Sequence, residues 1–152
     1  MDYLLDTNII LHLVRESKLS DKILLDYQLF EIPQRQFISI VTEGELESIA
    51  LQNEWGKNKT EELDNYLNKL INVDIRFGKI VKRYAEIDAF SQGKLKNRPL
   101  NISARNMTKN DLWIAATASV LDIPLITTDK DFAHLHNVFL DIILIDVIEA
   151  KK

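Results

Sequence analysis

Short apolar segments that alternate with longer helical stretches constrain the fold of this chain more than any other feature. The segments 3–5, 36–40, 124–127 and 141–146 each have the length and composition of one short strand. Between them, apolar residues recur at helical spacing. Strands separated by helices are typical of α/β domains with a mainly parallel sheet. We therefore expect an α/β fold in which four to five mainly parallel strands are flanked by helices.

The residues between these strands predict six helices. Ser20 is the expected cap of the second helix, Thr60 that of the fourth, and Thr108 or Asn110 that of the last. The last helix is apolar nearly all round, which predicts that it is buried. No repeat or linker divides the chain, so we expect a single domain over residues 1–152. The predicted helices cover residues 7–15, 19–29, 42–53, 60–71, 77–90 and 111–121.

The composition excludes several classes of site. Cysteine is absent, which rules out disulfides and thiolate metal sites. Any metal ion must be held by oxygen ligands or by His12, His134 and His136. The N-terminus carries Asp2 and Asp6 where a secretory signal has basic residues, and no long uncharged apolar run follows. We expect a cytoplasmic protein that does not enter a membrane.

Basic residues gather in one segment of an otherwise acidic chain. A net charge of −4 argues against a nucleic-acid-binding protein. Residues 94–109, however, contain five basic side chains and no acidic one. A local basic segment is a better electrostatic indicator than the net charge, although a solvated surface loop has the same composition. The basic residues of this segment are Lys94, Lys96, Arg98, Arg105 and Lys109.

Four acidic residues lie where strands end or helices begin. Asp6 follows the first predicted strand, and Asp129 closes the third. Glu45 lies in the first turns of the helix after the second strand, and Asp111 opens the buried helix. Open α/β sheets bind their ligands at the carboxyl ends of the strands. The four carboxylates are therefore expected to converge on one crevice.

Each of these acids also has a purely structural interpretation. Asp6 is a good helix cap, and Asp111 is an acid of the kind that the helix dipole favours in a first turn. Asp129 lies in a turn-forming segment. Glu45 stands between two other glutamates and has the pattern of a solvated helix residue. The functional interpretation depends on all four acids occurring together, in this order and context.

Four segments carry a resemblance to a known family. LLDTNIILHL, ISIVTEGELESIA, NDLWIAATA and PLITTDKDF are similar to the signature segments of PIN-domain ribonucleases, most closely VapC-type toxins of type II toxin–antitoxin systems. The resemblance runs from the first strand to about Phe132, with residues 141–147 fitting the last strand, and it implies a PIN-like fold. In that family, the acids that correspond to Asp6, Glu45, Asp111 and Asp129 bind divalent metal.

The resemblance also selects among neighbouring acids. The family pattern places the metal ligand directly before Leu46, which identifies Glu45 rather than Glu43 or Glu47. The family acid that follows a threonine pair corresponds to Asp129. Asp131 remains an alternative for this fourth position.

The expected chemistry follows from the charge of the site. Without a metal ion, four close carboxylates repel one another and at least one pKa rises. Mg²⁺ and Mn²⁺ prefer oxygen ligands, and either ion activates water for attack on a phosphodiester bond. Asp6 and Asp111 are the expected direct ligands, while Glu45 and Asp129 orient water or hold a second ion.

The neighbours of these acids are expected to position them. Thr7 and Asn8 are placed to orient Asp6, and Thr127 or Thr128 to orient Asp129, with Thr128 as our choice. Ordinary helix-cap and strand-end hydrogen bonds are the alternative interpretation of these residues.

The resemblance further implies an RNA substrate, such as tRNA, together with a cognate antitoxin and a homodimer. Arg98, Arg105 and Lys109 are the expected contacts to RNA phosphates. Two alternatives have the same sequence pattern: a catalytically silent PIN-like module that binds protein or RNA, and a nuclease that processes RNA without being a toxin.

Overall fold

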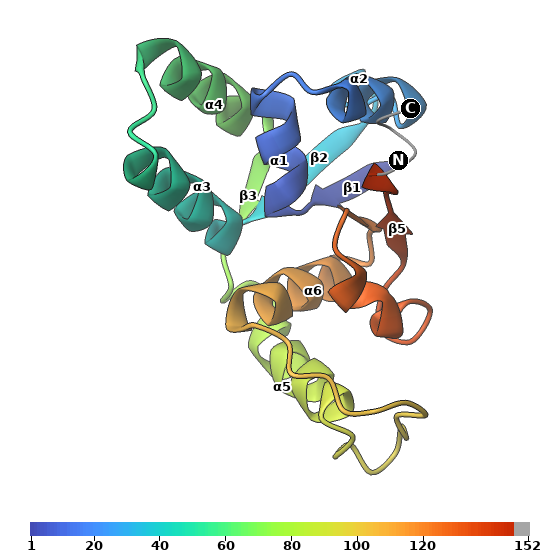
Figure 1. Cartoon of the computed structure of the whole chain (residues 1–152). Helices are drawn as coiled ribbons and strands as arrows, with labels where there is room; N and C mark the ends of the chain where they lie inside the picture. The colour runs from blue at the N-terminus through green and yellow to red at the C-terminus, as the bar shows by residue number, and fades with distance from the viewer. Residues whose placement is uncertain (148–152) are drawn as a thin grey trace.

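The computed structural model describes residues 1–147, so residues 148–152 of the predicted domain lie outside the described part (Figure 1). Within that part, no helix is long and apolar enough to cross a membrane. The elements in chain order are β1 (Asp2–Leu5), α1 (Thr7–Val14), α2 (Lys18–Asp26), β2 (Arg35–Ser39), α3 (Ile40–Gln52), α4 (Lys57–Lys69), β3 (Ile71–Val73), α5 (Ile80–Ser91), α6 (Lys109–Leu121), β4 (Leu125–Thr127), the 3₁₀ helix η1 (Lys130–Leu135) and β5 (Ile142–Leu144).

The strands form one five-stranded sheet in the order β3-β2-β1-β4-β5, and all neighbours are parallel. This confirms the expected α/β fold with its parallel sheet. The chain moves from β1 outward through β2 to β3, and then returns to place β4 on the other side of β1. The direction of winding therefore reverses between β1 and β4. Such a switch point opens a crevice at the carboxyl ends of the two strands.

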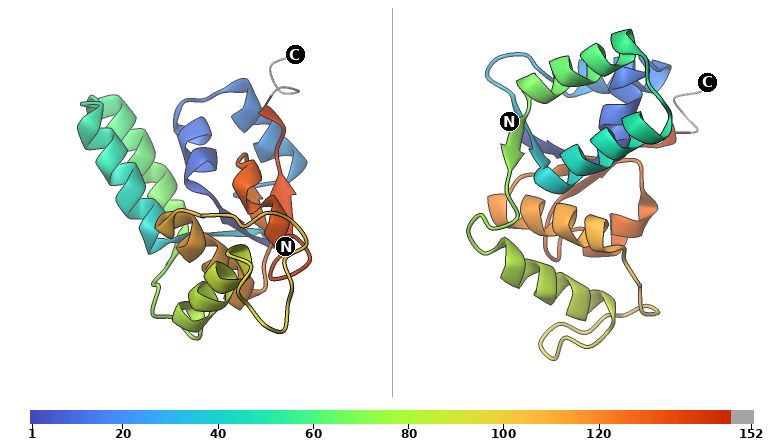
Figure 2. Two further views of the ribbon diagram at one scale, coloured as in Figure 1. Left: turned by 60° about the horizontal axis from the view of Figure 1, so that its bottom comes forward. Right: turned by 90° about the vertical axis from the view of Figure 1, so that its left-hand side faces the viewer.

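Helices cover both faces of the sheet (Figures 1 and 2). α1 to α4 pack on one face, and α5, α6 and η1 pack on the other. Right-handed crossovers require this arrangement because the winding direction reverses after β3. Strand residues alternate accordingly: Tyr3 and Leu5 belong to the core under α1–α4, whereas Leu4 belongs to the core under α5 and α6.

The helix α6 is buried as predicted. Ala115, Ala116 and Ala118 are fully inaccessible to solvent, and their small side chains let the helix pack closely between the sheet and α5. Thr108 is its N-cap, since its hydroxyl accepts a hydrogen bond from the Asp111 N–H at 3.2 Å. The helix ends at Asp122, which adopts a left-handed conformation with φ of 54°.

Three helices begin earlier than their sequence patterns predict. α2 is capped by Ser17 and not by Ser20, whose own N–H donates to the Ser17 hydroxyl at 3.1 Å. α3 is capped by Ser39, two residues earlier than the predicted helix would require. α4 starts after Gly56 and not at Thr60. In α2 and α3, a serine just upstream of the apolar pattern supplies the cap.

The third strand and the start of α5 also differ from the predictions. β3 contains only Ile71–Val73, which is too short for a pattern of alternation. The sequence predicts its first residue, Ile71, as the end of a helix and assigns the other two to no element. α5 begins at Ile80 and not at Phe77. The residues before it form tight turns in which Gly78 has a φ of +53°, a conformation that other residues rarely adopt.

Candidate active site

Asp6 lies at the switch point of the sheet, directly after β1, and caps α1. Its side chain is only 4% exposed. Oδ1 accepts a hydrogen bond from the Thr7 N–H at 2.8 Å, and Oδ2 accepts one from the Thr127 hydroxyl at 2.7 Å. Burial raises the pKa of Asp6 to about 6, although both hydrogen bonds oppose this shift. The fold therefore holds a carboxylate where its charge is costly.

Glu45 is tied to the same junction through Thr7. The Thr7 hydroxyl donates to Glu45 Oε1 at 2.9 Å and lies 3.2 Å from the hydroxyl of the fully buried Thr42. A hydroxyl has one proton, so Thr42 is the donor to Thr7 when Thr7 donates to Glu45. This chain of hydroxyl groups connects the first turns of α1 and α3 and orients the Glu45 carboxylate.

Asp111 approaches from the other face of the sheet, in the first turn of α6. The pKa of this half-buried carboxyl is raised to about 6, mainly by burial and in addition by the charges of Asp129, Glu45 and Asp131. The pKa of Asp6 is likewise raised by Asp111 and Glu45, after the larger effect of burial. Coulombic effects of this kind require short separations. The structure therefore brings the four predicted acids together, with Asp131 close by.

Asp129 caps η1, and its Oδ1 accepts a hydrogen bond from the Asp131 N–H at 2.9 Å. Its own backbone N–H donates to the Thr127 hydroxyl at 3.0 Å. The hydroxyl of Thr127 thus connects the carboxylate of Asp6 to the backbone of Asp129 at the start of η1. Asp131 is the more exposed of the two acids of this turn.

The donor set suits a divalent cation that prefers oxygen. Among residues 1–147, no group of three or more Asp, Glu or His side chains is arranged to hold a metal ion as it stands. Mg²⁺ is usually held by one or two carboxylates and keeps several waters. The carboxylates of Asp6 and Asp111, which are close enough for the charge of Asp111 to raise the pKa of Asp6, fit that requirement.

A groove of about 540 Å³ opens beside Glu45. One wall is a face of α3, and the other is Asn110 at the start of α6, next to Asp111. The groove therefore reaches the acidic site at Glu45 and at the residue that precedes Asp111. The residues that line it are Val41, Gly44, Glu45, Ser48, Ile49, Gln52 and Asn110.

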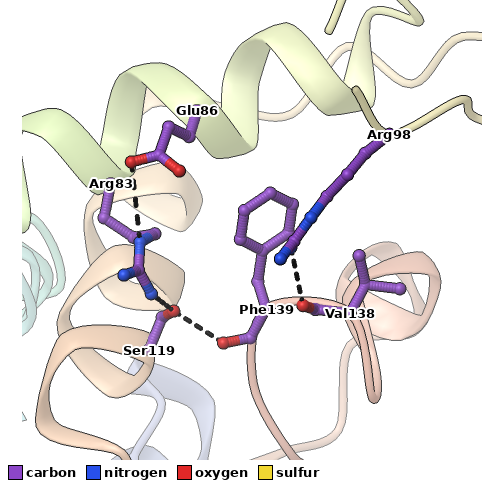
Figure 3. A network of polar contacts seen from close by, with 6 residues as sticks. All are labelled: Arg83, Glu86, Arg98, Ser119, Val138 and Phe139. Carbon is purple, nitrogen blue, oxygen red and sulfur yellow. Dashed lines mark hydrogen bonds and ion pairs between the residues drawn. The ribbon is translucent and has the colours of Figure 1, made fainter. Parts of the chain in front are cut away.

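Of the three residues predicted to contact RNA phosphates, one is packed against the protein through its side chain. Arg98 is held by the segment before β5, because its Nη1 donates to the Val138 carbonyl at 2.9 Å and its guanidinium lies 4.7 Å from the centre of the Phe139 ring (Figure 3). Arg105 and Lys109 are exposed. Lys109 is the first residue of α6, two positions before Asp111.

Sequence reasoning did not identify Thr42, and it left Thr127 as a second choice. Both are polar residues with no exposed surface. Asn8, which was expected to orient Asp6, is exposed in the first turn of α1. A threonine in an otherwise apolar, strand-end or helix-start position is the one signal that points to such buried hydroxyl groups.

Comparisons with solved structures find the same fold in toxin–antitoxin complexes. VapBC2 from Rickettsia felis, solved bound to a DNA fragment from its promoter, has a TM-score of 0.74 at 21% identity, covering 96% of this chain and 100% of that chain. VapBC-1 from nontypeable Haemophilus influenzae has a TM-score of 0.66 at 24% identity, covering 95% and 98%. VapBC-5 from Mycobacterium tuberculosis, a member of the VapBC family of toxin–antitoxin systems, has a TM-score of 0.61 at 20% identity, covering 95% and 98%.

At these identities the likeness concerns the fold. No curated protein sequence matches the chain significantly. The family model of the PIN domain matches residues 3–138, a range that contains β1 to η1 and all four converging acids. The chain belongs to the PIN-domain family.

Proposed function

We propose that this protein is a divalent-metal-dependent endoribonuclease, that it is the toxin of a toxin–antitoxin pair, and that it cleaves tRNA or another structured RNA. The observation that carries the proposal is the convergence of Asp6, Glu45, Asp111 and Asp129 at the switch point, where two of them have pKa values raised to about 6. PIN-domain nucleases generally use divalent metal ions.

Mg²⁺ or Mn²⁺, when bound, lowers the pKa of a water molecule and neutralises charge on the scissile phosphate. Asp6 and Asp111 would supply the oxygen ligands. Glu45 and Asp129 would orient the attacking water or hold a second ion. Each oxygen of Asp6 accepts one hydrogen bond within the protein, which leaves further lone pairs that could bind a cation.

The surrounding residues position these groups and the substrate. Thr7 orients both Asp6, through its N–H, and Glu45, through its hydroxyl. Asn8 and Thr128 flank the same junctions. Arg98, Arg105 and Lys109 contact RNA phosphates and so place the strand without reading its sequence.

The similarity to VapBC complexes supports the remaining parts of the proposal. Those structures contain a toxin and its antitoxin, and one was solved on promoter DNA. By analogy, a cognate antitoxin inhibits this protein, and the active form is a homodimer in the cytoplasm. We propose that the whole chain, residues 1–152, is one domain.

The direct test is cleavage of purified total tRNA by the wild-type protein in Mg²⁺ or Mn²⁺, with EDTA as the metal-free control. Asp6→Asn preserves the shape of the side chain and removes its charge, so the fold survives while metal affinity falls. Metal-dependent cleavage that disappears in Asp6→Asn supports the nuclease, and the position of the cut identifies the substrate.

The matched control is Glu47→Gln, which removes an exposed acid of α3 and is expected to cleave like the wild type. Well-folded wild-type protein that cleaves neither tRNA nor ribosomal RNA with either ion would contradict the proposal and favour the silent binding module. Cleavage without growth inhibition on expression would favour an RNA-processing nuclease.

A further inference from the structure

A hollow in the described part of the chain lies away from the acids, between the loop 92–108 and the end of η1. Its volume is about 620 Å³, within the range of pockets that bind small planar ligands. The loop extends beyond the C-terminal end of α5, on the face of the sheet opposite α1–α4 (Figures 1 and 2). Its lining residues are Phe90, Asn97, Arg98, Pro99, Leu100, Asn101, Ile102, His134, Asn137 and Val138.

The loop that forms this pocket is anchored at both ends. At its start, Gly93 takes a φ of +73° and closes α5 with hydrogen bonds from Gly93 N to Phe90 O at 2.9 Å and from Lys94 N to Ala89 O at 2.8 Å. At its end, Arg105 N donates to Ser91 O at 2.7 Å, and the side chain of Met107 is buried. The pocket is therefore formed before any ligand arrives.

The middle of the loop is fixed as well. Arg98 donates to the Val138 carbonyl, and its guanidinium stacks on Phe139 (Figure 3). In the same network, Ser119 of α6 donates to the Phe139 carbonyl at 2.6 Å, so the segment that receives Arg98 is itself attached to α6. The rim of the pocket is thereby held to the helix that carries Asp111.

The interior combines ring surfaces with amide groups. Phe90 and His134 lie with their rings nearly parallel, 5° apart in plane and 6.3 Å between centres. The His134 Nε2 is 2.8 Å from the Ser91 hydroxyl, which fixes the imidazole. Three asparagines, Asn97, Asn101 and Asn137, are among the residues that line the walls. Aromatic surfaces together with carboxamides match a nucleobase, which has a flat face and an edge of donors and acceptors.

The charge around the pocket matches the phosphates that accompany a base. The loop has no acidic residue between Lys94 and Lys109. Arg105 lies close enough to His134 for its charge to lower the imidazole pKa, after the larger effect of burial. Its side chain is exposed and available to a phosphate.

The pocket also lies within reach of the acids along the chain. Asp129 is the N-cap of η1, and His134 lies five residues later, next to the last residue of that helix. At roughly 2 Å of rise per residue in a 3₁₀ helix, they are separated by about 10 Å. An RNA strand that contacts the acids can therefore place a nearby nucleotide in the pocket.

We infer that this pocket binds one unpaired nucleobase of the RNA substrate, with Arg105 holding the adjacent phosphate. The inference rests on the proposed function for the identity of its ligand. The site positions single-stranded RNA, because a base enters the pocket only when it is not paired.

The test measures binding in EDTA, so that cleavage plays no part. A fluorescently labelled single-stranded oligoribonucleotide of mixed sequence is compared with an abasic oligomer of the same length, which keeps the phosphates and lacks the bases. Fluorescence anisotropy gives both dissociation constants for the wild type, for Asn97→Ala/Asn101→Ala, and for the control Asn65→Ala/Asn68→Ala. The control changes two exposed asparagines of α4, on the opposite face of the sheet.

We expect the pocket variant to bind the base-bearing RNA about 10-fold more weakly, which is the effect of one or two lost hydrogen bonds, and to bind the abasic oligomer like the wild type. The α4 control should match the wild type on both. The inference would be overturned if the pocket variant bound the base-bearing RNA as tightly as the wild type does. It would also be overturned if the variant lost the same affinity for the abasic oligomer as for the base-bearing RNA. Metal-dependent cleavage is measured in a separate assay, so that failure of the base-binding inference can be distinguished from failure of the proposed nuclease function.

Discussion

The acidic crevice, formed by Asp6, Glu45, Asp111 and Asp129, differs from the basic loop, residues 92–108, in its secondary structure and in the sign of its charge. In the crevice, ends of regular elements hold carboxylates that repel one another, and the pKa values of Asp6 and Asp111 rise to about 6. In the loop 92–108, basic residues face solvent with no acid among them. A polyanion is therefore attracted to the loop and repelled from the crevice until a divalent cation offsets the charge of the acids. In the proposed enzyme, substrate affinity and metal dependence reside in different regions.

The largest predicted effect is a loss of cleavage activity on substitution of Glu45, which the other acids of α3 should not share. Glu45→Gln should lower metal-dependent cleavage at least about 100-fold, comparable to removing one preorganised electrostatic group from an active site. Initial rates of tRNA cleavage in Mn²⁺ provide the measurement. Glu43→Gln serves as a second neighbour, whose carboxylate accepts from Asn72 on β3 at 2.6 Å instead of joining the site. Equal losses of cleavage rate in Glu45→Gln and Glu43→Gln would contradict the assignment of Glu45 to the active site.

The repulsion in the crevice predicts how the stability of the metal-free protein depends on pH. The pKa of Asp6 is raised from 3.8 to about 6 on folding. The folded state therefore binds the proton more tightly, and the free energy of unfolding falls as the pH rises through about 4 to 6. The loss amounts to roughly 2–3 kcal/mol for this buried group.

Asp6→Asn should remove most of this loss and so be more stable than the wild type at neutral pH in EDTA. Urea unfolding across the same pH range measures both proteins. Two results would show that ionised Asp6 does not destabilise the folded state. One is a wild-type stability that rises toward neutral pH, and the other is an Asp6→Asn variant whose stability has the same pH dependence as that of the wild type.

The hydroxyl of Thr127 stabilises the acidic crevice through two hydrogen bonds. Thr127→Val removes the donor to Asp6 Oδ2 and the acceptor for the Asp129 N–H. We expect a loss of about 1–3 kcal/mol in stability, because buried partners remain unsatisfied, and a lower affinity for Mn²⁺. Thr128→Val, one residue along, is the matched variant, and comparable effects from both would contradict the assignment to Thr127.

The smallest predicted effect concerns the anchor of the loop. Arg98→Ala removes the contact with the Phe139 ring and the hydrogen bond to Val138, and should lower stability by about 1 kcal/mol. Lys96→Ala, an exposed residue of the same loop, should leave stability unchanged. Thermal unfolding compares the two, and identical midpoints would show that the Arg98 anchor contributes nothing to the fold.

The two regions also differ in how far the sequence predicts them. Asp6 directly follows β1 and Asp129 comes two residues after β4, so their meeting at one edge follows from the parallel sheet alone. Glu45 required the family resemblance, because a helix with three glutamates does not indicate which one faces inward. Asp111 begins a helix on the other face of the sheet, and it reaches the site because the winding reverses after β3.

The pocket could not be predicted, because its walls meet through long-range packing. Phe90 and His134 are 44 positions apart, and Arg98 reaches the carbonyl of Val138 only when the loop is folded against the segment before β5. β3 was missed for a related reason: its three residues become a strand by pairing with β2, and their local pattern continues that of the preceding helix.

The central claim is that a divalent cation offsets the cost of holding Asp6 ionised at the switch point. Thermal unfolding of the wild type, Asp6→Asn and Glu47→Gln in EDTA and in millimolar Mg²⁺ or Mn²⁺ tests it without reference to activity. The account predicts that the ion raises the midpoints of the wild type and Glu47→Gln by several degrees, through binding to the folded state, and leaves Asp6→Asn unchanged. An equal rise in Asp6→Asn, or no rise in the wild type with either ion, would contradict it.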